Sequence, residues 1–137
     1  MEFLPSGLSK VVGDEEDLAR FLTSSSQFNG LMVKPSALLP NPKNRETSAF
    51  RHGIEPRESL WQIGNEHVAG GRTLHGAAIF KVRHVRSAML EVDSHEPPPR
   101  HANIVGWPWS ATDPDMDKAE RKERAAAIAQ HAELVRR

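Results

Sequence analysis

The first third of the chain changes several times between helix-like and strand-like spacing of its apolar positions. An acidic run at residues 14–17 precedes an apolar one, which predicts a short helix over residues 14–23, because acidic side chains favour the first turn of a helix. Residues 31–39 are apolar but contain Pro35, so they predict an edge strand or an extended arm. A polar turn is expected at residues 41–45.

The middle of the chain predicts one strand and one helix. Residues 46–52 contain Thr and Phe between a turn and a glycine, which favours a strand. Pro56 suits the first position of a helix, and apolar residues at helical spacing extend it over residues 56–68 until Gly70 and Gly71 end it.

The last part predicts two strands and two helices. The apolar run at residues 77–82 predicts a buried strand, and the alternating residues 90–93 predict a second strand close behind it. A short helix is expected between them, at residues 83–89. Asp113 and Pro114 suit the cap and first position of a helix that continues to the end of the chain. Its apolar stripe consists of Ala125, Ile128, Ala129, Ala132 and Val135.

This mixture of elements predicts a small α+β domain that spans residues 1–137. We expect a mostly antiparallel or mixed sheet of three to five strands, with helices packed on one face and a long C-terminal helix. The pattern does not specify the order of the strands.

The segment 95–109 departs from all of these patterns. It contains four Pro, two His and two Trp, and its prolines make it too irregular for a helix or a central strand. Because proline restricts the backbone before folding, the segment predicts a rigid loop that holds Arg100, His101 and Asn103 in one geometry.

Composition narrows the classes of function. The 18 basic residues balance 18 acidic ones, so no global field attracts the chain to nucleic acid or to anionic lipid. Cysteine is absent, which excludes disulfides, Cys-ligated zinc and thiol catalysis. The sequence begins without a signal-peptide pattern and has no run long enough to span a membrane, so we expect a soluble cytoplasmic protein.

Two Arg-His dipeptides are the main candidates for chemistry. Arg51 and His52 end a predicted strand, and Arg100 and His101 lie in the proline-rich loop. An arginine can bind a phosphate with two hydrogen bonds, while a neighbouring histidine can exchange a proton near neutral pH. We therefore expect Arg51, Arg100 and Asn103 to bind a ligand and His52 and His101 to be catalytic, if the dipeptides converge. Lys34, Lys43, Arg45 and Arg72 could frame such a site.

Other interpretations of the same residues stay open. Each Arg-His pair also fits a solvated or salt-bridged loop anchor. His95 and His101 with Asp93 and Glu96 suggest a metal site, but without the spacing of a known metal motif, and no metal or cofactor is assigned. A nucleic-acid interpretation rests on the basic residues 81–86 and on Trp107 and Trp109 as stacking surfaces, although these Trp residues also suit core packing.

The sequence thus predicts binding of a phosphate-bearing ligand, such as a nucleotide or a nucleic-acid segment, at a site capable of acid–base catalysis. The alternative is a non-enzymatic interaction or self-association module that uses the Pro/Trp-rich loop, either as a surface or to close the core.

The chain also resembles a group of small uncharacterised bacterial proteins. The segments that carry this resemblance are 33–40, 46–51, 96–104 and 106–108. The resemblance implies a bacterial, cytoplasmic source and adds no catalytic residue.

Overall fold

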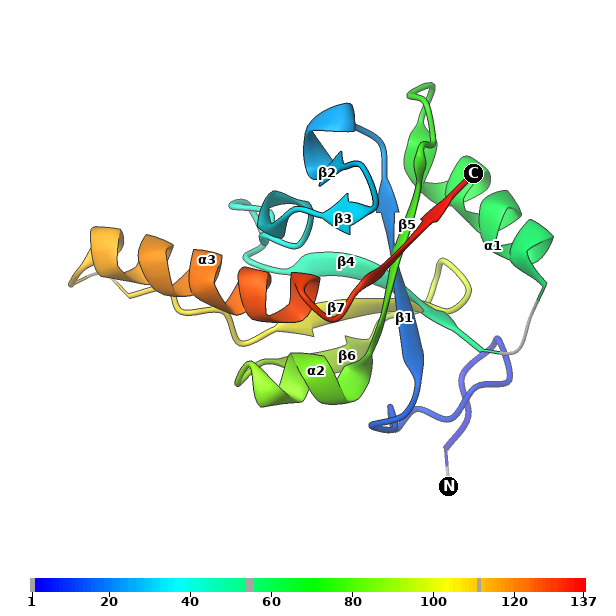
Figure 1. The fold of residues 1–137 in the computed structure, drawn as a ribbon. Coiled ribbons are helices and arrows are strands. Elements are labelled where there is room, and N and C mark those ends of the chain that lie inside the picture. Colours follow the sequence, from blue (N-terminus) through cyan, green and yellow to red (C-terminus); the bar gives the residue numbers. More distant parts are fainter. Residues whose placement is uncertain (1, 54–55, 111) are drawn as a thin grey trace.

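A six-stranded antiparallel sheet forms the centre of the molecule (Figure 1). The structure is a computed structural model that describes residues 2–53, 56–110 and 112–137. The sheet order is β6-β7-β4-β1-β5-β8, and a small hairpin pairs β2 with β3. The strands are β1 (Asp17–Leu22), β2 (Phe28–Asn29), β3 (Met32–Val33), β4 (Thr47–His52), β5 (Gly76–Lys81), β6 (Glu91–Ser94), β7 (His101–Val105) and β8 (Glu133–Arg136).

Helices lie on both faces of this sheet (Figure 1). The α-helices are α1 (Arg57–Gly64), α2 (Val82–Ser87) and α3 (Pro114–Ala129). A π-helical turn (Asn65–Ala69) continues α1, and short 3-10 turns are found at Ser25–Gln27 and Pro35–Ala37. The expectation of helices on one face only is therefore wrong, while the α+β class and the long C-terminal helix are confirmed.

The larger core lies between the sheet and the helices α2 and α3. Leu18, Phe80 and Ile104 point from the strands into this core, where Val85 of α2 and Ile128 of α3 meet them. All five are 2% exposed or less, so the apolar face of each helix is removed from water by the sheet.

The smaller core lies on the opposite face, beneath α1. Phe21 and Phe50 meet edge to face, with ring centroids 5.5 Å apart, and Leu60 of α1 packs against them. Among the described residues, this cluster takes none from β6 or β7. Asp93, His101 and Asn103 alternate with the core residues of these two strands and lie on that part of the face, which we call the open half of the sheet.

The predicted helix at residues 14–23 is wrong, because β1 occupies residues 17–22 as an inner strand. Leu18 and Leu22 enter the larger core, while Ala19 and Phe21 enter the smaller one. A strand buried on both faces has no alternation of apolar and polar residues, so its pattern imitates a helix.

Two further strands differ from the prediction. Residues 101–105 form the inner strand β7 inside the segment expected to be a loop. The C-terminal helix ends at Ala129, and β8 follows it instead of more helix. These strands raise the count of the main sheet to six, above the predicted three to five.

Three further strands and two helices agree with the prediction. The strands expected at 46–52, 77–82 and 90–93 are β4, β5 and β6, within one residue at most of their ends. The helices expected at 56–68 and 83–89 are α1 with its π-helical extension and α2. Within 31–39, only Met32–Val33 is extended, as part of the hairpin.

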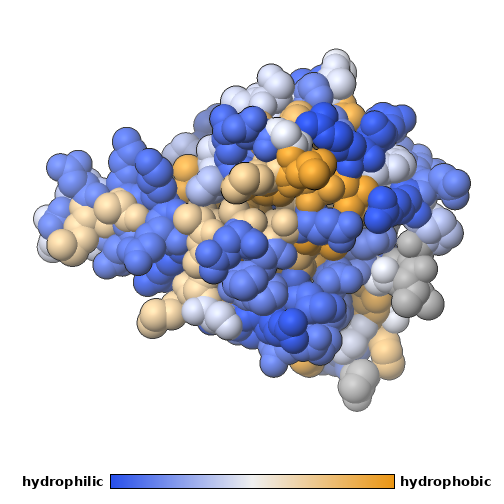
Figure 2. All heavy atoms as spheres, in the orientation of Figure 1, coloured by the Kyte–Doolittle hydropathy of each residue, from blue (hydrophilic) through white to orange (hydrophobic). Residues whose placement is uncertain are grey.

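Figure 2 shows where apolar atoms gather on the face that carries α3. They lie where the β2–β3 hairpin approaches the C-terminal part of α3, and Leu31 and Met32 there are 83% and 72% exposed. In the described part of the chain, no helix combines the length and apolar character needed to cross a membrane.

Candidate functional site

The two Arg-His dipeptides lie side by side at one end of the β4–β7 ladder. The backbone N–H of Arg51 donates to the carbonyl of Arg100 at 2.8 Å, and the Nε of Arg100 donates to the carbonyl of Arg51 at 2.8 Å. Phe50 stands opposite His101 in the register of the two strands. The topology therefore brings together segments that are about fifty residues apart in sequence.

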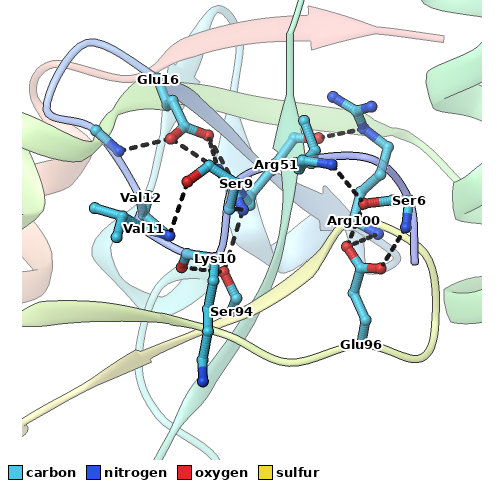
Figure 3. Close-up of polar contacts among 12 residues, drawn as sticks. Ser6, Ser9, Lys10, Val11, Val12, Glu16, Arg51, Ser94, Glu96 and Arg100 are labelled. Carbon is cyan, nitrogen blue, oxygen red and sulfur yellow. Dashed lines mark hydrogen bonds and ion pairs between the residues drawn. The ribbon is translucent and has the colours of Figure 1, made fainter. Parts of the chain in front are cut away.

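The guanidinium of Arg51 is buried and holds the N-terminal segment in place (Figure 3). Its Nε and Nη2 donate to Glu16 at 2.7 and 2.9 Å, and its Nη1 donates to the carbonyl of Ser9 at 2.6 Å and to Ser94 Oγ at 3.2 Å. The residue is only 3% exposed. This geometry supports the interpretation of Arg51 as a salt-bridged anchor and does not aim its charge at a ligand.

Glu96 ties the proline-rich loop to the same N-terminal segment (Figure 3). Its carboxylate accepts hydrogen bonds from the backbone and hydroxyl of Ser6, at 3.0 and 2.5 Å, and from the backbone of Arg100 at 3.1 Å. The loop is therefore fixed by charge-assisted hydrogen bonds as well as by its prolines.

A cavity of about 430 Å³ is lined by Arg51, His52 and Arg100 together. Three carboxylates share its lining, from Glu15, Glu16 and Asp17. Their negative charge opposes the binding of a phosphate at this point, so the cavity does not favour the anion site expected from the dipeptides.

His101 instead makes its strongest side-chain contact on the open half of the sheet. Its Nε2 lies 2.7 Å from the hydroxyl oxygen of Ser48 on β4. Its Nδ1 lies 2.9 Å from the backbone carbonyl oxygen of His95 and 3.2 Å from His95 Nδ1. The ring also packs against the edge of Phe50, with centroids 5.2 Å apart.

These contacts define the tautomer of His101. A carbonyl oxygen can only accept, so Nδ1 carries the proton and donates it to His95. Nε2 is then the acceptor, and the hydroxyl of Ser48 donates to it. A serine hydroxyl bonded to an imidazole that a third group orients is the arrangement found at activated nucleophiles.

The surroundings keep His101 neutral. Burial of the ring is the largest effect and lowers the pKa of His101 below its ordinary value of 6.5, and the charge interaction with His95 lowers this pKa further. The carbonyl of His95 and the carboxylate of Glu46 act in the opposite direction. At neutral pH the imidazole is therefore available as a base.

Arg20 fixes the backbone on which Ser48 stands. Its Nη1 donates to the carbonyl of Ser48 at 2.9 Å, and its Nε donates to the carbonyl of Ala37 at 2.9 Å. Burial, and next the charge of Arg72, lower the pKa of Arg20. Within the described ranges, no carboxylate forms an ion pair with this guanidinium.

Asn103 lies next to this pair. It stands opposite Ser48 on one side and opposite Asp93 on the other, and residues paired in this way share a face of the sheet. Asn103 is 8% exposed, so it belongs to the floor of the open half. His52 is farther along β4 and lines the acidic cavity instead.

The structure also bears on the alternatives. Across residues 2–53, 56–110 and 112–137, no group of three metal-ligating side chains comes together, although His95 and His101 are neighbours. Arg83 and Arg86 in the basic segment are paired with Glu15, Asp14 and Glu91. Trp107 is buried and donates to the carbonyl of Ile104 at 3.2 Å, so it closes the core.

The sequence interpretation had included His101 and Asn103 but not Ser48. The strand prediction over residues 46–52 contained the necessary signal, since Ser48 alternates with Phe50 and His52 on one face. Its partner strand β7 lies in the segment that the sequence predicts to be a loop, so the contact with His101 could not be predicted. Comparisons with models of protein families, with curated proteins and with solved structures find no match for this chain.

Proposed function

We propose that this protein binds a phosphate-bearing ligand on the open half of its sheet and that Ser48 and His101 carry out acid–base chemistry on it. The observation that carries the proposal is the 2.7 Å contact between Ser48 Oγ and His101 Nε2, with Nδ1 oriented by His95. A hydroxyl becomes a useful nucleophile when a neutral imidazole can take its proton.

The proposed reaction is the cleavage of a phosphoester. Ser48 Oγ attacks phosphorus while His101 Nε2 takes the hydroxyl proton, and His101 then returns that proton to the leaving alcohol oxygen. Water then attacks phosphorus while the same imidazole takes its proton, and the bond from phosphorus to Ser48 Oγ breaks. His101 returns the proton to Oγ, which restores the hydroxyl and releases phosphate.

Arg20 holds the proposed nucleophile's backbone from the opposite face of the sheet, where Leu18 and Leu22 enter the larger core. Its guanidinium is joined to the backbone of Ser48 and has no carboxylate partner among the described residues. Arg20 therefore positions the backbone of Ser48 and does not face the proposed ligand.

A panel of aryl phosphate monoesters and diesters tests this function. We expect turnover of at least one ester, and a loss of about a hundredfold or more in both Ser48→Ala and His101→Gln. Ser87→Ala is the matched control, because Ser87 is an exposed serine at the end of α2. Unchanged turnover in Ser48→Ala, or no turnover of any ester, would contradict the proposal.

Self-association is the second candidate function, and one observation favours it. Leu31 and Met32 expose apolar side chains beside α3, where they line a groove of about 250 Å³. We expect light scattering after size exclusion to show a dimer that Leu31→Ser with Met32→Ser dissociates. A monomer in both proteins would contradict this candidate.

A further inference from the structure

A separate cavity lies where the chain enters α3, at the opposite end of β4 from the Arg51 network. It has a volume of about 330 Å³ and is lined by Arg45, Trp109, Ser110, Pro114, Asp117 and Arg121. Arg45 comes from the turn before β4, and Trp109 and Ser110 come from the segment after β7. The cavity therefore joins three parts of the chain.

Two guanidinium groups meet the same indole ring in this cavity. The guanidinium carbon of Arg121 is 3.9 Å from the centroid of Trp109, and that of Arg45 is 5.2 Å from it. Arg121 is further fixed by donation from Nη1 to the carbonyl of Pro108 at 2.8 Å. A guanidinium held against an aromatic face keeps its in-plane N–H donors directed outward, and its ordering cost is reduced before a ligand arrives.

The charges of the cavity are unbalanced. In the described part of the chain, neither Arg45 nor Arg121 has a carboxylate within ion-pair distance. Asp117 is the acidic member of the lining, but it is 9% exposed and its Oδ2 accepts a hydrogen bond from the backbone of Ser110 at 2.5 Å. Both guanidinium groups therefore line the cavity without an ion-pair partner among the described residues, while the Asp117 carboxylate is held by the backbone of Ser110.

We infer that this cavity binds the phosphate group of a phosphomonoester. A monoester carries close to two negative charges at neutral pH, which two guanidinium groups can match, and its oxygens suit their planar donors. The Ser110 backbone and Asp117 brace the wall beside Trp109. This site is separate from Ser48 and His101, and it stands whether or not those residues perform chemistry.

Titration with inorganic phosphate and with AMP, followed through the indole N–H signal of Trp109 in ¹H–¹⁵N spectra, tests the inference. The signal should shift with both probes and should saturate, and sodium chloride at equal ionic strength should not reproduce the shift. Arg121→Met and Arg45→Met should each weaken binding by about tenfold or more, since each removes charged hydrogen bonds.

Two variants keep the result interpretable. Lys122→Met removes a neighbouring positive charge on α3 outside the cavity lining and should bind as the wild type does. His101→Gln should also bind phosphate and AMP in this cavity as the wild type does. A loss of turnover at Ser48 and His101 is therefore distinguishable from a loss of binding at Trp109. Absence of a saturable shift, equal weakening in Lys122→Met, or equal binding of adenosine and AMP would overturn the inference.

Discussion

At the residue scale, Arg51 and Arg20 have different roles, and the sequence singled out only Arg51. Arg51 is enclosed with Glu16, whereas Arg20 carries a charge without a carboxylate partner in the described chain. The sequence identified the strand that carries Arg51 but not the N-terminal segment that covers it. The carboxylate that neutralises Arg51 is 35 residues away in the sequence, so no local pattern could predict the pairing.

Replacement of Arg51 by Met tests its structural role. We expect a loss of about 3 kcal/mol in the free energy of unfolding, because Glu16 and two further acceptors lose their donor. Urea unfolding measures this loss. Lys10→Met is the control, since Lys10 pairs with Glu2 at the surface and should contribute less than about 1 kcal/mol. Equal stability of the two variants would show that Arg51 is not an anchor.

The pKa of His101 makes a prediction about pH. The folded protein lowers this pKa, mainly by burial, so the unfolded chain binds a proton more readily than the native state. The stability associated with neutral His101 is fully present above about pH 6.5 and is lost as the pH falls through the unfolded pKa towards the lower folded one.

Unfolding measured across this range, in wild type and in His101→Gln, checks the sign. The wild type should lose stability on acidification more steeply than the variant. Parallel curves would mean that the ring is solvated as in the unfolded chain. His95 and Glu46, the charged groups that act on the ring, remain in both proteins.

At the element scale, the sequence predicted three strands and two helices well. It failed where contacts between distant elements determine the secondary structure. β4, β5 and β6 have neighbouring turns or glycines that bound them locally. In contrast, β1 has a helical spacing, and β8 continues the apolar stripe of α3 through Ala132 and Val135. Their pairing with β5 selects the strand state, and that pairing is not visible in a local window.

Gly76 is the residue that lets β8 approach β5. A Cβ added there would lie 2.3 Å from the carbonyl oxygen of Val135, which is too close without movement of the backbone. Gly76→Ala should therefore separate the two strands and cost about 1–3 kcal/mol. Hydrogen exchange should accelerate at amides of β8 before those of β4.

Gly13→Ala provides the matched control, because a Cβ there meets only Glu16 Oε2 at an ordinary 3.7 Å. It should leave the exchange of β8 unchanged. If the β8 amides of Gly76→Ala exchanged hydrogen as slowly as those of the wild type, the close approach of β8 to β5 would not require a glycine.

At the scale of the whole molecule, the helices cover the two faces of the sheet unequally. Helices α2 and α3 cover one face of the sheet, and α1 covers part of the other, which leaves polar residues of β4 and β7 uncovered. His101 and Asn103 could be proposed from the sequence because the proline-rich segment drew attention to them. Ser48 could not, since its role depends on the pairing of β4 with β7.

The central claim is that His101 activates Ser48, and labelling with a fluorophosphonate measures this most directly. Such a probe transfers its phosphorus to an activated serine hydroxyl, and mass spectrometry of the digested protein locates the adduct. We predict one adduct, on Ser48, that is absent from His101→Gln and retained in Ser87→Ala. An unlabelled protein, or an adduct on Ser48 that persists without His101, would contradict the account.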